Sequence, residues 1–357
     1  MIAMKIRLFK HTIFCLIIFS NTCFGKEFNE LFIVNEPIGN NFNIEKSINN
    51  SFNTMIYRLS GDPSPSNIWK IINAGNSRKD FIQSYSIKNQ NNENFLEVYF
   101  DKDLLVKKFN ELSIPAIGVS RPVILFLINI DTGTSIPYLL KDSQSKFEID
   151  FLIKKSLDKL FNSRGIFLEL PEPDLEDLTL ISSYSKVINS NNFLNAKYAS
   201  DEVIEIKITK IGVNEWLVDG DISFEYRDKN FNDFFIEKFE EFVSIKINDL
   251  LNKNTIDTSQ SNLVKLSIDK IYNYDDYANS KDLIRNLVGT KEIDIDSFAI
   301  GKISYSLDIY GNFDSLIKEI SDSNFMKITN IEYSNNSIEL ELVRWVNILF
   351  LYLIYYR

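Results

Sequence analysis

The alternation of hydrophobic and polar positions predicts helices and strands in close succession in the first third of the chain. Apolar residues spaced three and four apart over residues 44–59 are typical of an amphipathic helix, which Gly61-Asp62-Pro63 ends. A predicted strand at residues 95–100 precedes a second helix with apolar positions over residues 104–112. We therefore expect an N-terminal α+β domain over residues 26–118.

The middle of the chain opens with an apolar run at residues 123–130, in which only Asn129 is polar, and such a run is typical of a strand buried on both faces of a sheet. A predicted helix over residues 149–161 and a predicted strand at residues 166–170 follow, in the order of a βαβ unit. Alternating apolar and polar residues from 202 to 226 predict an antiparallel hairpin at one edge. These elements define a central α/β domain over residues 119–252.

The last third begins with a polar segment at residues 253–262, which predicts a linker. Residues 263–357 then carry strand and helix patterns in the order βαββαβ, with a final hairpin over residues 326–343. That order resembles the split βαβ, ferredoxin-like plan. The expected fold class is thus α+β with mixed α/β sheets: strand–helix layers come first and a ferredoxin-like domain comes last.

The ends of the chain differ from its middle. Lys5, Arg7 and Lys10 precede a short apolar run at residues 12–19, and this pattern predicts a secretory signal peptide (residues 1–25) cleaved near Gly25. The expected location is the periplasm. The run is too short to span a bilayer, which takes about 20 apolar residues, so no transmembrane span is expected.

The apolar tail, Trp345–Arg357, is also too short to cross a membrane unaided. Burial as a last strand is one interpretation. Docking to a partner or to a membrane is the other.

Cleavage near Gly25 would remove the only His and both Cys, which are His11, Cys15 and Cys23. The mature chain would then lack the residues for Ser-His-Asp or Cys-His catalysis, thiolate or His metal sites, haem ligation by His, and disulfides. We therefore predict no cofactor and no metal site of these kinds. A chain of 357 residues with 45% hydrophobic content can fold on its core alone.

The formal charge is −10 at pH 7, and loss of the signal peptide makes it more negative by three. No basic run remains to attract phosphates, so nucleic-acid binding is not expected, and anionic membrane surfaces should repel the protein. Ser-x-x-Lys recurs along this Ser- and Lys-rich chain without Lys-Thr-Gly, and neither a Walker loop nor GxGxxG occurs. Nothing in these motifs identifies a catalytic residue.

The densest acidic cluster lies directly after the predicted strand at residues 166–170 and contains Glu169, Glu172, Asp174 and Asp177. Paired carboxylates can hydrolyse glycosides or bind Ca²⁺. The segment lacks the glycine and the regular ligand spacing of an EF-hand, and a solvated acidic loop is the simpler interpretation.

Two further residues are candidates for binding, together with Asp174 and Asp177. Arg121, before Pro122 and the buried strand, could hold a carboxylate or phosphate with two hydrogen bonds, or pair with an acid of the loop around Asp174. Trp216 opens a predicted hairpin strand, where it could pack on the core or serve as a ligand platform.

A series of short motifs is similar to one group of exported proteobacterial proteins. The motifs are Phe100-Asp101, Pro115 to Gly118, Arg121-Pro122, Arg164-Gly165, Pro171 with Asp174 and Asp177, Tyr198-Ala-Ser-Asp201 and Trp216. The group is the family catalogued as domain of unknown function 2066, and the resemblance covers roughly residues 28–226. It departs at Ile117, where the family pattern has Trp. The resemblance implies a cell-envelope protein and no established activity.

These observations predict an exported periplasmic protein that binds or assembles envelope proteins without catalysis. The alternative is a carboxylate-based, glycosidase-like hydrolase centred on residues 169–177.

Overall fold

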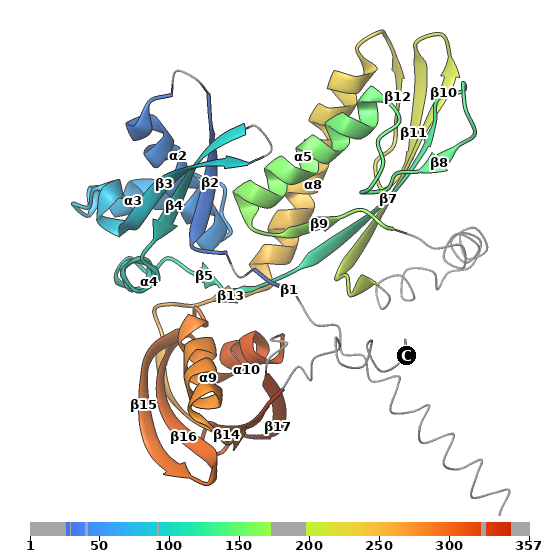
Figure 1. The fold of residues 1–357 in the computed structure, drawn as a ribbon. Helices are drawn as coiled ribbons and strands as arrows, with labels where there is room; N and C mark the ends of the chain where they lie inside the picture. The colour runs from blue at the N-terminus through green and yellow to red at the C-terminus, as the bar shows by residue number, and fades with distance from the viewer. Residues whose placement is uncertain are drawn as a thin grey trace, which may run out of the picture.

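The computed structural model describes residues 26–28, 30–39, 42–90, 93–172, 198–322 and 326–343. The expected signal peptide, Asp174, Asp177 and the apolar tail lie outside the described residues. The described chain has the α+β class expected from the sequence, with helices and several mixed or antiparallel sheets arranged in three units (Figure 1). Within the described residues, no helix is both long enough and apolar enough to cross a membrane.

The N-terminal unit is a three-stranded antiparallel sheet in the order β2-β4-β3 with helices packed against it. Its elements are β2 (Ile33–Ile38), α2 (Ile44–Ser60), α3 (Ser66–Asn73), the 3-10 helix η1 (Arg78–Phe81), β3 (Ile82–Gln90), β4 (Glu93–Phe100) and α4 (Lys102–Glu111).

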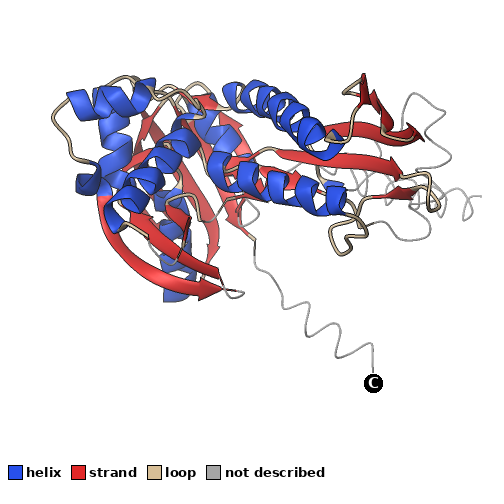
Figure 2. Ribbon diagram, turned by 90° about the horizontal axis from the view of Figure 1, so that it is seen from above, coloured by secondary structure: helices blue, strands red, loops and turns tan. Residues whose placement is uncertain are grey.

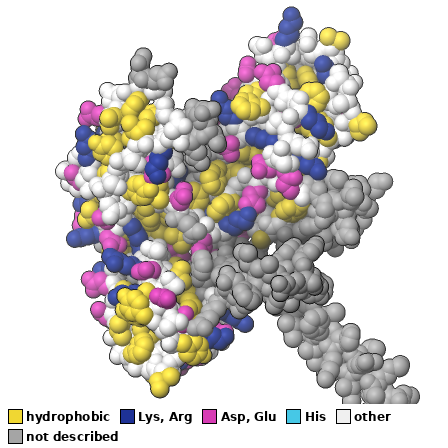
Figure 3. Space-filling view, viewed as in Figure 1, with side chains coloured by type: hydrophobic (Ala, Val, Ile, Leu, Met, Phe, Trp, Pro, Cys, Tyr) yellow, Lys and Arg dark blue, Asp and Glu magenta, His cyan; other side chains and the backbone are white. Residues whose placement is uncertain are grey.

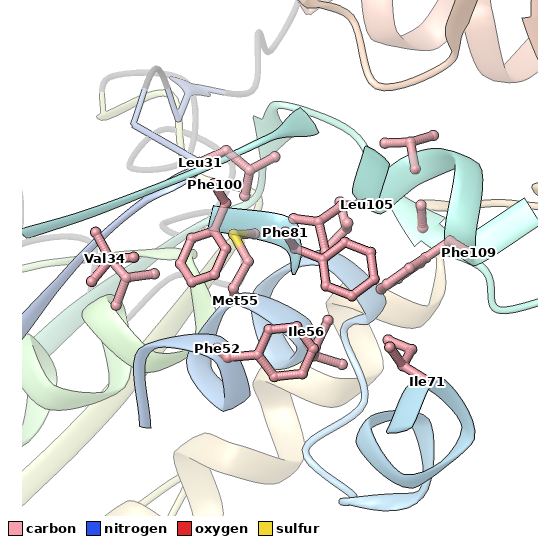
Figure 4. Close-up of a cluster of buried hydrophobic side chains, with 14 of the residues drawn as sticks. Leu31, Val34, Phe52, Met55, Ile56, Ile71, Phe81, Phe100, Leu105 and Phe109 are labelled. Carbon is pink, nitrogen blue, oxygen red and sulfur yellow. The ribbon is translucent and has the colours of Figure 1, made fainter. Parts of the chain in front are cut away.

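The boundaries of α2 follow from local chemistry. The side chain of Asn43 accepts hydrogen bonds from the first backbone N–H groups of the helix, and Gly61 ends it in the left-handed conformation at φ 71°. The apolar stripe of α2 packs on the sheet, and Phe52, Phe81 and Phe100 meet there in the core that Figure 4 shows. The predicted helix over residues 44–59 is therefore confirmed.

The central unit is a mixed sheet in the order β12-β11-β10-β7-β8, with β9 also beside β7. Its elements are β7 (Val123–Asp131), β8 (Tyr138–Leu139), α5 (Glu148–Arg164), β9 (Phe167–Glu169), β10 (Glu202–Gly212), β11 (Glu215–Gly220), β12 (Phe224–Arg227) and α8 (Phe231–Asn252).

Strand β7 is buried on both faces, as its apolar run predicts. Ile124 and Phe126 face the long helices α5 and α8, which lie side by side on one face of the sheet (Figure 2). Leu125 and Leu127 face the other way, into a smaller cluster with Val203. Strands β9 and β10 both run parallel to β7, so the strand–helix–strand order forms the expected βαβ unit.

The C-terminal unit is a five-stranded sheet in the order β15-β16-β14-β18-β17. Its elements are β14 (Ser261–Ile271), α9 (Tyr274–Asn286), β15 (Thr290–Ala299), β16 (Gly301–Tyr310), α10 (Phe313–Ser321), β17 (Met326–Glu332) and β18 (Ser337–Leu342).

The first four elements follow the split βαβ plan, because β16 lies between β14 and β15 and is antiparallel to both. The final hairpin adds one strand to the expected four. Strand β18 runs parallel to β14 and separates it from β17, which becomes an edge. The hairpin was predicted, but its placement depends on long-range pairing that residue periodicity does not encode.

The three units meet at a short segment, residues 116–121, which we call the junction. Within it, β5 (Ala116–Ile117) pairs with β13 (Thr255–Ile256), and β6 (Ser120–Arg121) pairs with β1 (Lys26–Glu27).

The predicted linker at residues 253–262 contains β13 and is a structured connection. Ile256 is buried, and the Thr258 hydroxyl donates to the carbonyl oxygen of Ile114 at 2.7 Å.

Candidate functional site

Buried arginines fill the place where the N-terminal and central units meet. Arg121 has no exposed surface, and its guanidinium donates to the carbonyl oxygens of Arg58, at 2.9 Å, and Ile117, at 3.3 Å. Arg164 donates to the carbonyl oxygen of Gly61 at 2.6 Å. The carbonyls of Arg58 and Gly61 belong to the C-terminal end of α2, where no intrahelical donor reaches them. The two arginines therefore cap α2 and fasten it to the central unit.

The position of Arg121 differs from the expectation of a ligand-binding arginine. Among the described residues its hydrogen bonds go to backbone carbonyls, and its side chain does not reach the surface. Burial, together with the nearby positive charge of Arg58, lowers the pKa of Arg121 to about 9. The group stays cationic at neutral pH and acts on the end of a helix. The sequence could not show this, because the end of α2 lies about 60 residues away along the chain.

A buried carboxylate attaches the C-terminal unit to the junction. Glu319, on α10, accepts backbone N–H groups of Val288 at 2.7 Å, Gly289 at 3.1 Å and Val119 at 3.3 Å. Burial raises the pKa of Glu319, while these hydrogen bonds and the charge of Lys102 oppose the rise. One carboxylate thus joins the helix α10, the turn before β15 and the junction.

The close approach of Glu319 explains a glycine in the junction. A Cβ atom on Gly118 would lie 2.8 Å from Oε1 of Glu319, too close for an undisturbed fit. Lys102, the first residue of α4, makes a second link between the units. Its Nζ donates to the carbonyl oxygens of Arg285 and of Leu287, the latter at 2.7 Å, at the end of α9. Burial lowers the pKa of Lys102.

A cavity of about 560 Å³ lies between the N-terminal unit and α9, next to these links. Charged residues of both signs line it, but they have partners within the protein. Asp101 caps α4 through the backbone N–H of Leu104 at 3.0 Å, and Asp103 lies 3.6 Å from the guanidinium of Arg285. The crevice therefore offers neither a row of unpaired cations for an anion nor two carboxylates aimed at one point.

The two described carboxylates of the acidic segment do not converge. Glu169 forms an ion pair with Lys26 on β1, and Glu172 accepts the backbone N–H of Ser143 at 2.5 Å, which lowers the pKa of Glu172. Neither side chain lines the cavity of about 560 Å³. Among the residues that the structure describes, no group of three or more His, Cys, Asp and Glu side chains could hold a metal ion.

Trp216 packs within the protein. Its ring stacks on Phe231, with 4.3 Å between ring centroids and 5° between the planes, and the ammonium of Lys210 lies 5.5 Å from its centroid. This arrangement ties β11 to the start of α8. Of the four residues singled out for binding, Arg121 and Trp216 are thus packing residues, and the structure does not bring them together.

A feature that points outward is strand β15, at one edge of the C-terminal sheet. Within the described residues β15 pairs with β16 alone. Ile295 pairs with Tyr305 and Phe298 pairs with Ile303, both of which point into the core beneath α9 and α10. Ile295 and Phe298 lie on the same face beyond the reach of the helices, and they are 50% and 66% exposed. Apolar side chains exposed along a free strand edge are a common site of protein association.

More apolar residues surround the far end of β15. Ile300 in the following turn is fully exposed, Tyr274 at the start of α9 is 76% exposed, and Tyr272 is exposed beside Gly301. Hydrophobic side chains are gathered over this lower part of the C-terminal unit in Figure 3. We call Ile295, Phe298, Ile300, Tyr272 and Tyr274 the edge patch. It is the candidate binding surface.

Sequence reasoning predicted the strand but missed the patch. The alternation over residues 293–298 is that of a strand with one buried face, and no local signal says that the strand is an edge. Ile295, Phe298 and Ile300 close to one turn were the available hint.

Searches against protein-family models, curated proteins and solved structures give no match.

Proposed function

We propose that the protein is exported to the periplasm, with cleavage near Gly25, and that it binds other envelope proteins without catalysing a reaction. The single observation that carries the proposal is the edge patch, which leaves large apolar side chains in water beside a strand edge that no other described residue pairs with. Burying them against a partner would be favourable by about 25 cal/mol for each Å² removed from water. The resemblance to the exported family named above is in keeping with this proposal.

The architecture supports the same proposal. The junction holds the N-terminal, central and C-terminal units through buried arginines, Glu319 and Lys102. A unit fixed in this way presents its free edge in a constant orientation, and a preorganised surface loses less entropy on binding. The N-terminal and central units would then act as the base on which the C-terminal sheet is displayed.

The experiment is a crosslinking pull-down from envelope fractions with three proteins. They are the wild type, an edge variant (Phe298→Thr with Ile300→Thr) and a matched control (Ile136→Thr with Val213→Thr). Ile136 and Val213 are each 87% exposed, but they lie in turns of the central unit. We expect the wild type and the control to recover the same partner and the edge variant to lose it. Equal recovery by all three would refute the edge patch as the binding surface.

A further inference from the structure

The two faces of β15 carry different chemistry. On the face that bears the helices, Ile293, Ile295 and Phe298 follow one another. On the opposite face, Glu292 pairs with Asp308 and Asp294 pairs with Ser306. A strand added alongside β15 would place successive side chains on alternate faces. Its side chains would therefore meet apolar groups on one face and carboxylates on the other.

The carboxylates decide which strand can be added. A second copy of β15 that paired over residues 292–294 would bring carboxylates opposite carboxylates, and like charges directly opposite each other destabilise a strand pair. A partner with Lys or Arg at these positions would be stabilised instead. Lys291, the basic residue next to Glu292, forms its ion pair with Asp308 on β16, at 2.5 Å, and its electrostatic interaction with Glu292 is weaker. The whole chain has a formal charge of −10, so long-range attraction also favours a basic partner.

We infer that β15 receives an extended segment of a partner protein in which basic and apolar residues alternate, and that this segment pairs with the strand edge through its backbone. This inference rests on the proposed function and names the chemistry of the partner. The backbone groups of β15 give affinity, the carboxylates of Glu292 and Asp294 select basic side chains, and Ile295 with Phe298 hold the apolar ones.

Synthetic peptides test the charge selection. A ten-residue peptide that alternates Lys and Val is titrated into the mature full-length protein, and a peptide that alternates Glu and Val is the matched control. We expect the basic peptide to bind at least about tenfold more tightly, and to weaken as ionic strength rises from about 50 to about 500 mM. In Glu292→Lys with Asp294→Lys the preference should reverse. Equal binding of both peptides to the wild type would overturn the inference.

Backbone pairing needs a separate test, because a basic peptide could also bind by charge alone. Two versions of the peptide carry N-methyl groups on alternate backbone nitrogens. One version is methylated at the odd-numbered residues and the other, in the opposite phase, at the even-numbered residues. An added strand presents every second N–H to its neighbour, so one phase should abolish binding and the other should leave it nearly unchanged. Equal effects of both phases would contradict strand addition. Binding should also perturb the backbone amide NMR signals of β15 more than those of β17.

The outcomes separate this inference from the proposed function. If the edge variant loses its partner in the pull-down but neither phase of methylation matters, the patch binds a partner and strand addition is wrong. Binding that is seen only after residues 344–357 are removed would show that the edge is occupied by the chain itself, and would overturn the partner assignment. The peptides could bind as expected while the edge variant still recovers its partner. That result would support the addition of a basic strand at β15 and would refute the edge patch as the surface that binds the envelope partner.

Discussion

The junction and the edge of β15 both lie at the border of a unit, and both mix charged with apolar residues, but they are used in opposite ways. At the junction, the buried Arg121 donates to backbone carbonyls, and the buried Glu319 of α10 accepts backbone N–H groups of other elements. Along β15, the charges of Glu292 and Asp294 are in water and the apolar residues are exposed with them. Buried charges with partners fix how the units pack against one another. An exposed apolar strand edge, by contrast, remains available to pair with another chain.

The largest effect should come from truncating Arg121. Arg121→Ala removes the cap on α2 and leaves a cavity in the interior, so we expect a loss of about 3–4 kcal/mol in the free energy of unfolding, measured by urea denaturation. Arg121→Met keeps much of the volume and relieves the repulsion from Arg58, and should lose less than half as much. If both variants denature at the urea concentration of the wild type, the junction does not hold the units together.

Truncation of Glu319 should follow in size. Glu319→Ala leaves the backbone N–H groups of Val119, Val288 and Gly289 without their acceptor in the interior, which should cost about 3 kcal/mol. Asp314→Asn, at an exposed position on the same helix, is the control and should change stability by less than about 0.5 kcal/mol. Similar losses in the two variants would mean that α10 is simply sensitive to substitution.

A pH series sharpens the role of Glu319. Because burial raises the pKa of Glu319, the folded state takes up this proton more readily than the unfolded chain. Its contribution to stability is therefore fully present below the ordinary carboxyl pKa and is lost as pH rises through the raised folded value. The stability of the wild type relative to Glu319→Gln, which does not ionise, should therefore fall as the pH rises above the ordinary carboxyl pKa. Urea denaturation of both proteins at each pH measures this difference, and a constant difference would contradict the prediction.

The smallest effect on stability should come from the edge. Phe298→Thr with Ile300→Thr removes side chains that are already mostly in water, so we expect a change of less than about 1 kcal/mol by the same urea measurement. The same variant should lose its partner in the pull-down. A large destabilisation would show that the patch belongs to the core of the C-terminal unit, and the comparison with the junction would no longer hold.

The sequence predicted those helices and strands whose buried faces appear as a periodic pattern of apolar residues. The stripe of α2 and the apolar run of β7 are examples, since each pattern repeats with the period of its element. It did not predict that Arg121 caps a helix, that β18 lies beside β14, or that β15 is an edge. These three features depend on which elements become neighbours in space, and residues far apart in the sequence decide that.

The contacts of the junction can form only in a certain order as the chain is made. β6 can pair with β1, which precedes it in the chain. β5 can pair only after β13 has been made, and Val119 can donate to Glu319 only after a further 200 residues have been made. A chain that folds as it emerges from one end can form the sheet of the N-terminal unit early, but its last contacts close only when nearly all of it has emerged. Until then the backbone N–H of Val119, whose acceptor is Glu319, is open to water. The protein should therefore reach protease resistance late and in one step.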